Sequence, residues 1–447
     1  MDDFTASVET SLELIDKWLA FQRYYTQLPS ISVGIGIGGK TLFEKGYGFA
    51  DMEKRITATP STLYRVASHS KLFTASAIMR LYEQGKLRLD DLIVDHLGWF
   101  ATDGNPDQAE MTIRQLLSHS SGMNRDGDTD HWLNDEFPDL DSLKRQCREG
   151  VRMFDANVNW KYSNMAFSVL GHLVAAVTGK DYETAVGELV IDPMALNHTM
   201  PDFTETSLSD HAIGYHMLLP GETREPLDHV HARAMNAATG FSSCVTDLLR
   251  FYHLHQLDSG QFLKDTTKRE MQRQQFAKGP SIWGLGFELG DRADRKFIGH
   301  SGAYPGFLSR SGFDPGNNLT IVVLTNSSDS MPSLLYEGVL SIIHFVHKQG
   351  HKLKGGAQDH ALLDELSGYY RDRWGISCMQ RVGDGAVSFA PAHAYPTETF
   401  TRLDYVGEQT FRDANGGNIG EKTQLRKNAN GNWSIKGYGD AFFIPPW

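Results

Sequence analysis

The sequence predicts an α+β fold, in which helices flank an antiparallel sheet that a large helical insertion interrupts, followed by a small all-β domain. Two observations place the sheet: short alternating or β-branched runs occur at residues 32–49 and return at 307–324. A third places the insertion, because helical periodicity dominates from residue 68 to about 275. Joining both ends in one sheet gives a layered architecture rather than an alternating parallel one.

The first elements follow from local patterns. Apolar residues recur at helical spacing over residues 6–24, which predicts an amphipathic helix. Residues 32–37 and 41–49 flank a Gly-Gly pair, which predicts a β-hairpin. A further helix is expected from Lys71 to Leu81, with Gly85 as its stop signal.

The later elements complete the prediction. Residues 307–313 and 319–324 flank the turn sequence DPGN and predict a second hairpin, followed by an apolar helix from Pro332 to about His347. Residues 348–360 are typical of a linker. The tail is rich in Gly, Tyr, Phe and short alternating runs. We therefore predict a first domain over residues 1–350 and a small β-domain over residues 361–447.

Composition narrows the class of partner and the compartment. The 447 residues carry a net charge of −12, which disfavours nucleic acid or an anionic membrane as a partner. Three widely spaced cysteines do not form a disulfide framework or a zinc site. The start of the chain lacks the pattern of a signal peptide, so we expect a cytoplasmic protein. Homo-oligomer formation is left open.

Several motifs suggest other functions. Residues 34–41 read GIGIGGKT and match a phosphate-binding loop, but a strand pattern follows where such a loop needs a helix. A hairpin turn is therefore preferred over a nucleotide-binding protein. Asp126, Asp128 and Asp130 open a calcium-loop pattern that lacks its later glycine and glutamate. Two His-x-His pairs lack a third ligand nearby, and we expect no metal or cofactor.

The pair Ser68 and Lys71 is the strongest candidate for chemistry. It forms the S-x-x-K of this chain and stands at the start of the predicted helix, where residues three apart share a face. Serine needs a base to act as a nucleophile at neutral pH. A lysine pKa near ~10.4 would have to fall by about 3 units, which costs ~4 kcal/mol and requires burial or a partner.

Two further motifs supply partners. Tyr162-Ser163-Asn164 offers a tyrosine whose pKa a neighbouring ammonium would lower, so that Tyr162 and Lys71 titrate as a coupled pair. Taken alone, the tripeptide equally fits a capped helix start. The segment 299–303, GHSGA, offers small residues and backbone N–H groups beside a strand edge. Taken alone, it equally fits a glycine-bounded strand end.

In this order, the three motifs resemble those of the penicillin-recognising serine hydrolases: class C β-lactamases, D-alanyl-D-alanine carboxypeptidases, D-aminopeptidases and β-lactamase-like esterases. The resemblance covers about residues 10–350. Segments similar to the family also occur at 46–51 (GYGFAD), 112–122 (TIRQLLSHSSG), 240–243 (GFSS) and 283–287 (WGLGF). The β-rich tail resembles the lipocalin-like barrels appended to some members.

The resemblance implies roles for individual residues. Ser68 is the expected acylated nucleophile, Lys71 its partner and Tyr162 the proton carrier for the leaving group. Asn164 is expected to contact substrate or Lys71, and His300 and Gly302 to line the substrate cleft. The backbone N–H groups of Ser68 and Ala303 are the expected oxyanion hole.

One departure from the family shifts the expected substrate. β-Lactamases usually carry Lys-Thr-Gly at the third motif, and this chain carries His300 instead of the lysine. A histidine with an ordinary pKa of ~6.5 is only about one quarter charged at pH 7, so it holds a carboxylate weakly. We therefore expect a serine hydrolase acting on a small ester or a D-amino-acid amide or peptide. A β-lactamase or a penicillin-binding protein without turnover is the alternative.

Overall fold

The structure is a computed structural model, and it describes residues 3–292, 295–349, 359–435, 439–442 and 444. The chain divides into two compact units. The larger unit is Ser32–Pro332, and the smaller unit combines Met1–Ile31 with Ser333–Trp447. The predicted division at residues 350 and 361 stays a prediction, because most of the expected linker lies outside the described residues.

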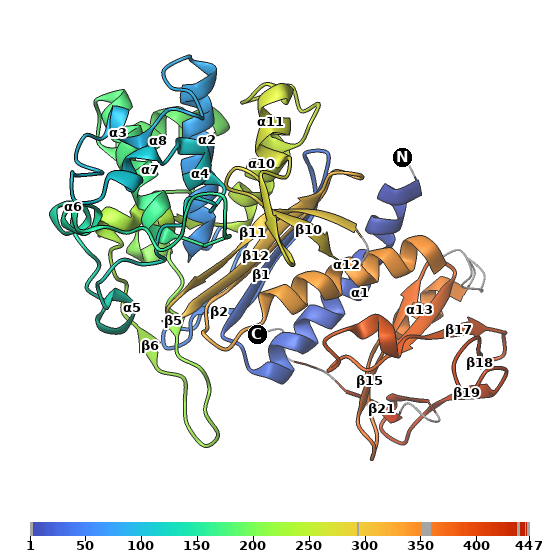
Figure 1. The fold of residues 1–447 in the computed structure, drawn as a ribbon. Coiled ribbons are helices and arrows are strands. Elements are labelled where there is room, and N and C mark those ends of the chain that lie inside the picture. The colour runs from blue at the N-terminus through green and yellow to red at the C-terminus, as the bar shows by residue number, and fades with distance from the viewer. Residues whose placement is uncertain (1–2, 293–294, 350–358, 436–438, 443, 445–447) are drawn as a thin grey trace. The chain divides into compact units, whose positions relative to one another are not determined.

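A nine-stranded sheet forms the framework of the larger unit. Its strand order is β3-β2-β1-β13-β12-β11-β10-β9-β8, so the early hairpin lies beside the late strands (Figure 1). This arrangement confirms that both ends of the insertion join one sheet. The strands are β1 (Ser30–Ile37), β2 (Lys40–Asp51), β3 (Ile56–Thr57), β8 (Phe276–Lys278), β9 (Ser281–Trp283), β10 (Glu288–Arg292), β11 (Arg295–Tyr304), β12 (Phe307–Asp314) and β13 (Leu319–Thr325).

The glycine-rich motif near the start of the chain makes the predicted hairpin. Gly38 and Gly39 both have positive φ angles, 54° and 87°, which a two-residue hairpin turn of this kind requires. Strand β2 follows at once, where a phosphate-binding loop would begin a helix. Gly34 is needed for packing, because a Cβ there would lie 2.4 Å from the Val245 side chain.

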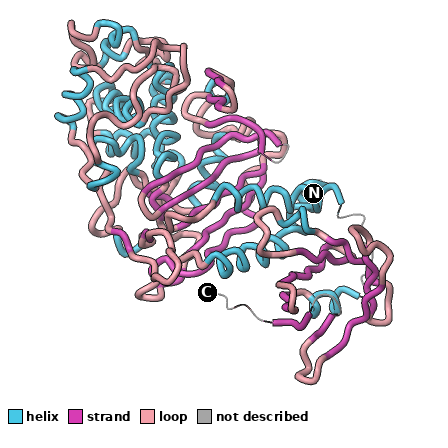
Figure 2. The backbone as a smooth tube through the Cα atoms, turned by 60° about the horizontal axis from the view of Figure 1, so that its bottom comes forward, coloured by secondary structure: helices cyan, strands magenta, loops and turns pink. Residues whose placement is uncertain are grey.

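The insertion is helical, as predicted. Its helices gather beside the sheet, and Figure 2 shows them apart from the strands. Most of helix α2 is buried, and Phe73 on it stacks on Phe241 with ring centroids 4.6 Å apart. The helices are α2 (Ser70–Glu83), α3 (Ile93–His96), α4 (Ile113–Leu117), α5 (His131–Asn134), α6 (Leu140–Glu149), α7 (Asn164–Thr178), α8 (Tyr182–Val186), α9 (Asp192–Met194), α10 (Val245–His255) and α11 (Asp265–Gln272). Two short hairpin pairs are β4 (Tyr64–Arg65) with β7 (Ser242–Ser243) and β5 (Gly214–Tyr215) with β6 (Pro226–Leu227).

The smaller unit contains both predicted terminal helices and a closed eight-stranded barrel, which confirms the β-rich tail. Helices α1 (Asp3–Thr26) and α12 (Pro332–Gln349) approach closely at Gly338, where a Cβ would lie 2.1 Å from the Trp18 ring. Buried apolar residues, Tyr370, Leu403 and Phe411 among them, form the core of the barrel. Its elements are α13 (His360–Leu366), β14 (Gly368–Arg371), β15 (Ile376–Val382), β16 (Gly385–Phe389), β17 (Thr401–Tyr405), β18 (Thr410–Asp413), β19 (Lys422–Lys427), β20 (Trp433–Ile435) and β21 (Gly439–Phe442). Among the residues described, no helix has the length and apolar character needed to span a membrane.

Candidate active site

Ser68 lies on a tight 3₁₀ turn, Ala67–His69, that leads directly into helix α2. Ala67 is held in the left-handed region at φ 50°, an unfavourable conformation for a residue with a Cβ. Neighbouring side chains hold the turn in place. Ser70 Oγ donates to the Ala67 carbonyl and accepts from the Phe241 backbone N–H. His69 is buried and hydrogen-bonded through both ring nitrogens, to the Val66 carbonyl and to Ser311 Oγ. Ser68 is therefore fixed at the helix start.

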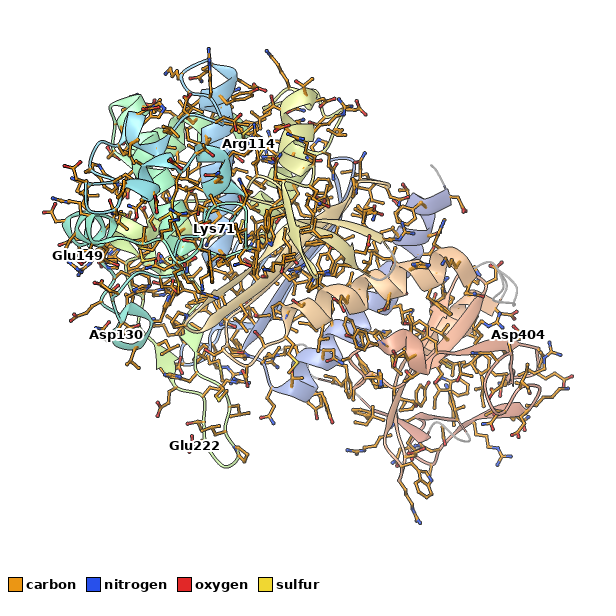
Figure 3. The ribbon with its side chains drawn as sticks, viewed as in Figure 1. Lys71, Arg114, Asp130, Glu149, Glu222 and Asp404 are labelled. Atoms are coloured by element: carbon orange, nitrogen blue, oxygen red, sulfur yellow. The ribbon has the colours of Figure 1, made fainter. Side chains whose placement is uncertain are left out.

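Lys71 is fully buried one helical turn beyond Ser68, at the junction of α2 and the sheet (Figure 3). Its Nζ lies 3.2 Å from Ser68 Oγ. It donates to Asn164 Oδ1 and to the Ala238 carbonyl, each at 2.7 Å. Burial lowers the pKa of Lys71 well below its ordinary value, and the nearby Asp126 carboxylate only partly opposes this.

Asn164, at the start of helix α7, connects Lys71 to a carboxylate. Its Nδ2 donates to Asp126 Oδ1 at 2.5 Å, and Asp126 also contacts Arg125 Nε at 3.2 Å. A carboxylate only accepts hydrogen bonds, so this contact fixes the orientation of the amide and turns Oδ1 toward Lys71. The predicted contact of Asn164 with Lys71 is thus present in the structure.

Tyr162 differs from the expectation in its ionisation. Lys71 Nζ lies 4.8 Å from the centroid of the Tyr162 ring. Burial raises the pKa of Tyr162, while interaction with the Ser68 side chain and the charge of Arg125 act in the opposite direction. The predicted lowering by a neighbouring ammonium is therefore wrong, because desolvation outweighs the cations. Tyr162 is a protonated phenol in this site.

The third motif lies on strand β11. Gly302 pairs with Ser309 on β12, and a Cβ at Gly302 would lie 2.3 Å from the Val66 carbonyl. The strand can therefore approach the Ser68 turn only because residue 302 is glycine. Ala303, the next residue, is exposed and lines the same cavity as Ser68.

His300 also differs from the expectation. Its side chain is only 2% exposed, and burial together with the charge of Lys71 lowers its pKa to about 3. The ordinary pKa that we assumed from the sequence is wrong, because that value applies to a solvated ring. The imidazole is neutral at pH 7, which weakens carboxylate binding further than one-quarter charging does.

A cavity of about 800 Å³ connects these residues. One wall is aromatic: Trp160 stacks on Trp283 at 5.8 Å, and Trp283 meets the His300 ring edge-on at 5.3 Å. Another aromatic contact, Trp132 against Tyr304 at 5.7 Å, also lines the cavity. Charged residues at its surface are Arg125, Asp126, Lys161 and Glu288. Among the described residues, no cluster of ligating side chains has the composition of a metal site.

Comparisons with known proteins agree with this geometry. The sequence model of the Beta-lactamase family matches residues 19–340. The chain belongs to the beta-lactamase family. Its fold, and its place in a family of serine hydrolases, confirm the resemblance seen in the sequence.

Individual relatives of this beta-lactamase-family chain are distant. Protein flp of Staphylococcus aureus (strain N315) is 26% identical over 333 residues, which span 74% of this chain and 66% of that protein. The octameric penicillin-binding protein homologue from Pyrococcus abyssi has a TM-score of 0.65 at 20% identity, covering 95% of this chain and 98% of that one. The class C beta lactamase from Rhodobacter sphaeroides has a TM-score of 0.61 at 21% identity, covering 77% and 99%.

The structure adds residues to the site that sequence reasoning missed. Asp126 was considered only as a calcium ligand, and Arg125, Trp132, Trp160 and Glu288 carried no motif. His119 and Trp283 fall within segments similar to the family, but neither was assigned a role. The His119 ring packs against Tyr162 with centroids 4.4 Å apart and accepts the Ser163 backbone N–H at Nδ1. Composition and spacing carry no signal for these contacts, which depend on packing.

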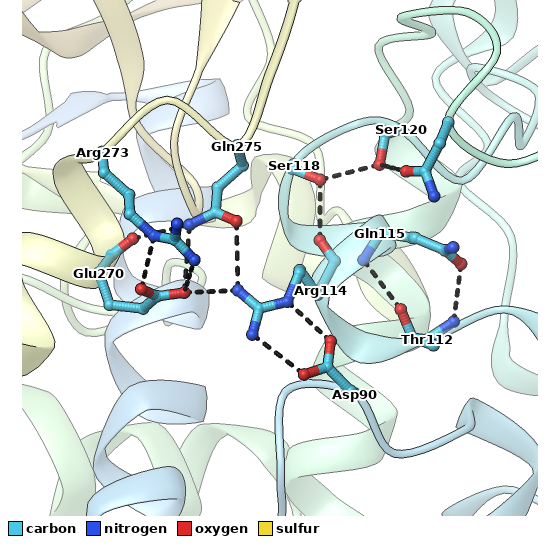
Figure 4. A network of polar contacts seen from close by, with 10 residues as sticks. Asp90, Thr112, Arg114, Gln115, Ser118, Ser120, Glu270, Arg273 and Gln275 are labelled. Carbon is cyan, nitrogen blue, oxygen red and sulfur yellow. Dashed lines mark hydrogen bonds and ion pairs between the residues drawn. The ribbon is translucent and has the colours of Figure 1, made fainter.

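A polar network anchors the segment that carries His119 (Figure 4). Arg114 on helix α4 donates to Asp90 through Nε at 2.7 Å and to Glu270 on helix α11 through Nη1. Further along the segment, Ser120 Oγ donates to Asn157 Oδ1 at 2.9 Å. These contacts tie the loops before Tyr162 to the helical region, so the tyrosine side of the cavity is held at several points.

Proposed function

We propose that this protein hydrolyses a small ester or a D-amino-acid-containing amide or peptide through an acyl-enzyme on Ser68. The observation that supports it best is the set of contacts around Lys71. A neutral amine has two N–H donors and one lone pair. The carbonyl of Ala238 and Oδ1 of Asn164 take the two donors. The lone pair is then left for the Ser68 hydroxyl.

Acylation follows from this arrangement. Lys71 accepts the Ser68 proton as Ser68 Oγ attacks the substrate carbonyl carbon. Burial favours the neutral amine that this step needs. The backbone N–H groups of Ser68 and Ala303 are the proposed donors to the oxyanion that develops on the carbonyl oxygen. The close approach of β11 at Gly302 supports this pairing.

Tyr162 is the proposed acid for the leaving group. Its raised pKa keeps the phenol protonated, so it can donate a proton to a leaving alkoxide or amine. Lys71, which holds the proton from Ser68, can then reprotonate Tyr162. In deacylation the same groups act in reverse: a water molecule gives up its proton and attacks the acyl carbon, and Ser68 Oγ is released.

The substrate class rests on the cavity. Its aromatic walls favour apolar or aromatic groups on the substrate. A neutral His300 does not supply the permanent cation that would attract a carboxylate, which supports an ester, amide or peptide over a β-lactam. A panel of p-nitrophenyl esters, D- and L-amino-acid anilides and a chromogenic cephalosporin tests this. Efficient cephalosporin turnover, with esters and anilides inert, would contradict the proposal.

A penicillin-binding protein that acylates without turnover is the second candidate. The similarity to the penicillin-binding protein homologue from Pyrococcus abyssi favours it. It predicts a burst of product equal to the enzyme concentration and no steady state, whereas a hydrolase continues to turn over. Stopped-flow measurement with a p-nitrophenyl ester separates the two.

Oligomeric state and location are also proposals. The Pyrococcus abyssi homologue is octameric, and we propose that this chain too forms a homo-oligomer. Light scattering coupled to size-exclusion chromatography gives its mass directly, and a monomer at all concentrations would contradict the proposal. A cytoplasmic location is tested by fractionation of cells that express the full-length protein.

A further inference from the structure

The two ring nitrogens of His300 have different surroundings. Nδ1 lies 2.6 Å from the backbone oxygen of Ser301. A carbonyl oxygen can only accept a hydrogen bond, so Nδ1 carries the proton. In a neutral imidazole the other nitrogen, Nε2, then has a lone pair and no proton. His300 therefore presents an acceptor at Nε2.

This acceptor has no partner in the protein. Nε2 of His300 is buried and makes no hydrogen bond to any residue that the structure describes. Its side chain lines the cavity that contains Ser68. A buried acceptor without a partner is unusual in proteins and calls for a ligand or a functional reason.

The surroundings of the ring explain why no protein group pairs with it. The rings of Trp283 and Tyr162 lie 5.3 and 6.3 Å from His300, centroid to centroid. The nearby cation Arg310 is occupied, because it donates to Glu288 at 2.7 and 3.2 Å. The remaining direction for a partner is the cavity.

We propose that His300 Nε2 accepts a hydrogen bond from the substrate, so that this subsite takes an N–H or O–H donor and rejects a carboxylate. The inference rests on the proposed hydrolase function of Ser68 and narrows its substrate class. A carboxylate offers only acceptors and would place a second lone pair against Nε2. The site therefore fits an amide within a chain, or an amidated end, rather than a peptide whose free C-terminal carboxylate must be bound.

Two matched substrate series test the inference, because the donor can lie on either side of the scissile bond. In the first, the leaving group of an N-acyl-D-alanyl-D-alanine ends in a carboxamide, a methyl ester or a free carboxylate. In the second, the acyl group of a glutaric acid p-nitrophenyl ester ends in the same three groups. Each measurement is a ratio of kcat/KM values within one enzyme, so a partly folded variant still gives a valid ratio.

Wild type is expected to prefer the carboxamide over both other ends by about 10- to 100-fold in at least one series. H300F keeps an aromatic ring but has no acceptor, and it should lose the preference of carboxamide over methyl ester. H300Q offers an amide oxygen and should restore part of it, while H300K should favour the carboxylate. A wild type that treats all three ends alike or prefers the carboxylate in both series overturns the inference, as does an unchanged preference in H300F.

Failure of the proposed function looks different. Acylation of Ser68 by p-nitrophenyl acetate is followed in parallel by intact mass, using an ester that carries neither a donor nor a carboxylate. Without acylation of Ser68, the hydrolase proposal itself is wrong. If Ser68 is acylated and the series are flat, only the role of His300 is wrong.

Discussion

Asn164 Oδ1 accepts a hydrogen bond from Lys71 Nζ at 2.7 Å, while the same amide donates to Asp126 through Nδ2. This relationship determines how Lys71 is presented to Ser68. The amide cannot rotate without placing its N–H₂ against a lysine donor, and the carboxylate behind it prevents that rotation. The orientation of the proposed base is thus fixed by an acid that does not touch the nucleophile.

Replacing Asp126 by Asn is predicted to shift the acid limb of the pH profile of kcat/KM to lower pH. The Asp126 carboxylate raises the pKa of Lys71 against the larger effect of burial. Because neutral Lys71 is the active form, activity rises with pH through its pKa, and removing the negative charge lowers that pKa. We expect a shift of about 1 pH unit or more. D128N is the control, since Asp128 pairs with Arg145 at the surface. A limb that does not move in D126N, or moves up, contradicts the role of Lys71 as base.

Replacing Tyr162 by Phe is predicted to harm substrates according to their leaving group. A p-nitrophenolate leaves without protonation, so its hydrolysis should fall less than about tenfold. An alkyl ester or an amide needs the acid, and its kcat/KM should fall by about 10²- to 10⁴-fold. Rates with both substrates on one preparation measure the difference. Equal losses would assign Tyr162 to packing, in agreement with its contact with His119.

Replacing Gly302 by Ala is predicted to lower both kcat and the melting temperature. The added methyl group would lie 2.3 Å from the Val66 carbonyl and 2.4 Å from Ser309 Oγ, so strand β11 must move away from the Ser68 turn. We expect kcat to fall at least about tenfold, because donors to an oxyanion depend on sub-ångström placement. G98A is the matched control, since nothing lies within 4 Å of a Cβ there. A G302A enzyme with unchanged kcat removes Ala303 from the proposed oxyanion hole.

Stability is predicted to decline as the pH falls below 6.5. Burial lowers the pKa of His69 and His300 to about 3 and that of His255 to about 4. A lowered pKa in the folded state means that the unfolded chain binds the proton more tightly, so stability is lost between pH 6.5 and about 4. Each such group contributes up to ~1.4 kcal/mol per pH unit in that window.

Chemical denaturation at pH 7, 6, 5 and 4.5 measures this decline. H255Q removes one of the buried groups and should make the free energy of unfolding less dependent on pH. H198Q changes an exposed histidine and should not. Identical pH dependence in wild type and H255Q contradicts the assignment.

The sequence alone predicted the parts of the fold that local patterns determine. The helix after Ser68 and the two hairpins follow from spacing and turn residues, and the structure confirms them. The three motifs also come together around one cavity. What failed was ionisation: Tyr162 and His300 were assigned pKa behaviour appropriate to solvated groups, and burial changes both. Burial at a given residue is a product of tertiary packing, which no local pattern encodes.

The contacts that support the site were equally out of reach. Asp126 lies 38 residues before Asn164 in the chain, and only the folded insertion brings the two together. Strands β8 to β10 were not predicted, because they are short and hold few alternating residues. The aromatic wall combines Trp160, from the insertion, with Trp283, from the sheet. Such pairs have no fixed spacing for a pattern to detect.

The measurement that tests the central claim most directly is the site of covalent labelling. Wild type is treated with a fluorophosphonate, and the adduct is located by intact mass followed by peptide mapping. The account predicts one adduct per chain, on Ser68, with no adduct in S68A and turnover of a p-nitrophenyl ester in S68A reduced by ~10⁴-fold or more. S281A, which changes another serine of the same cavity, should label as wild type does. An adduct confined to a different serine, or an S68A protein that turns over the ester at the wild-type rate, would contradict it.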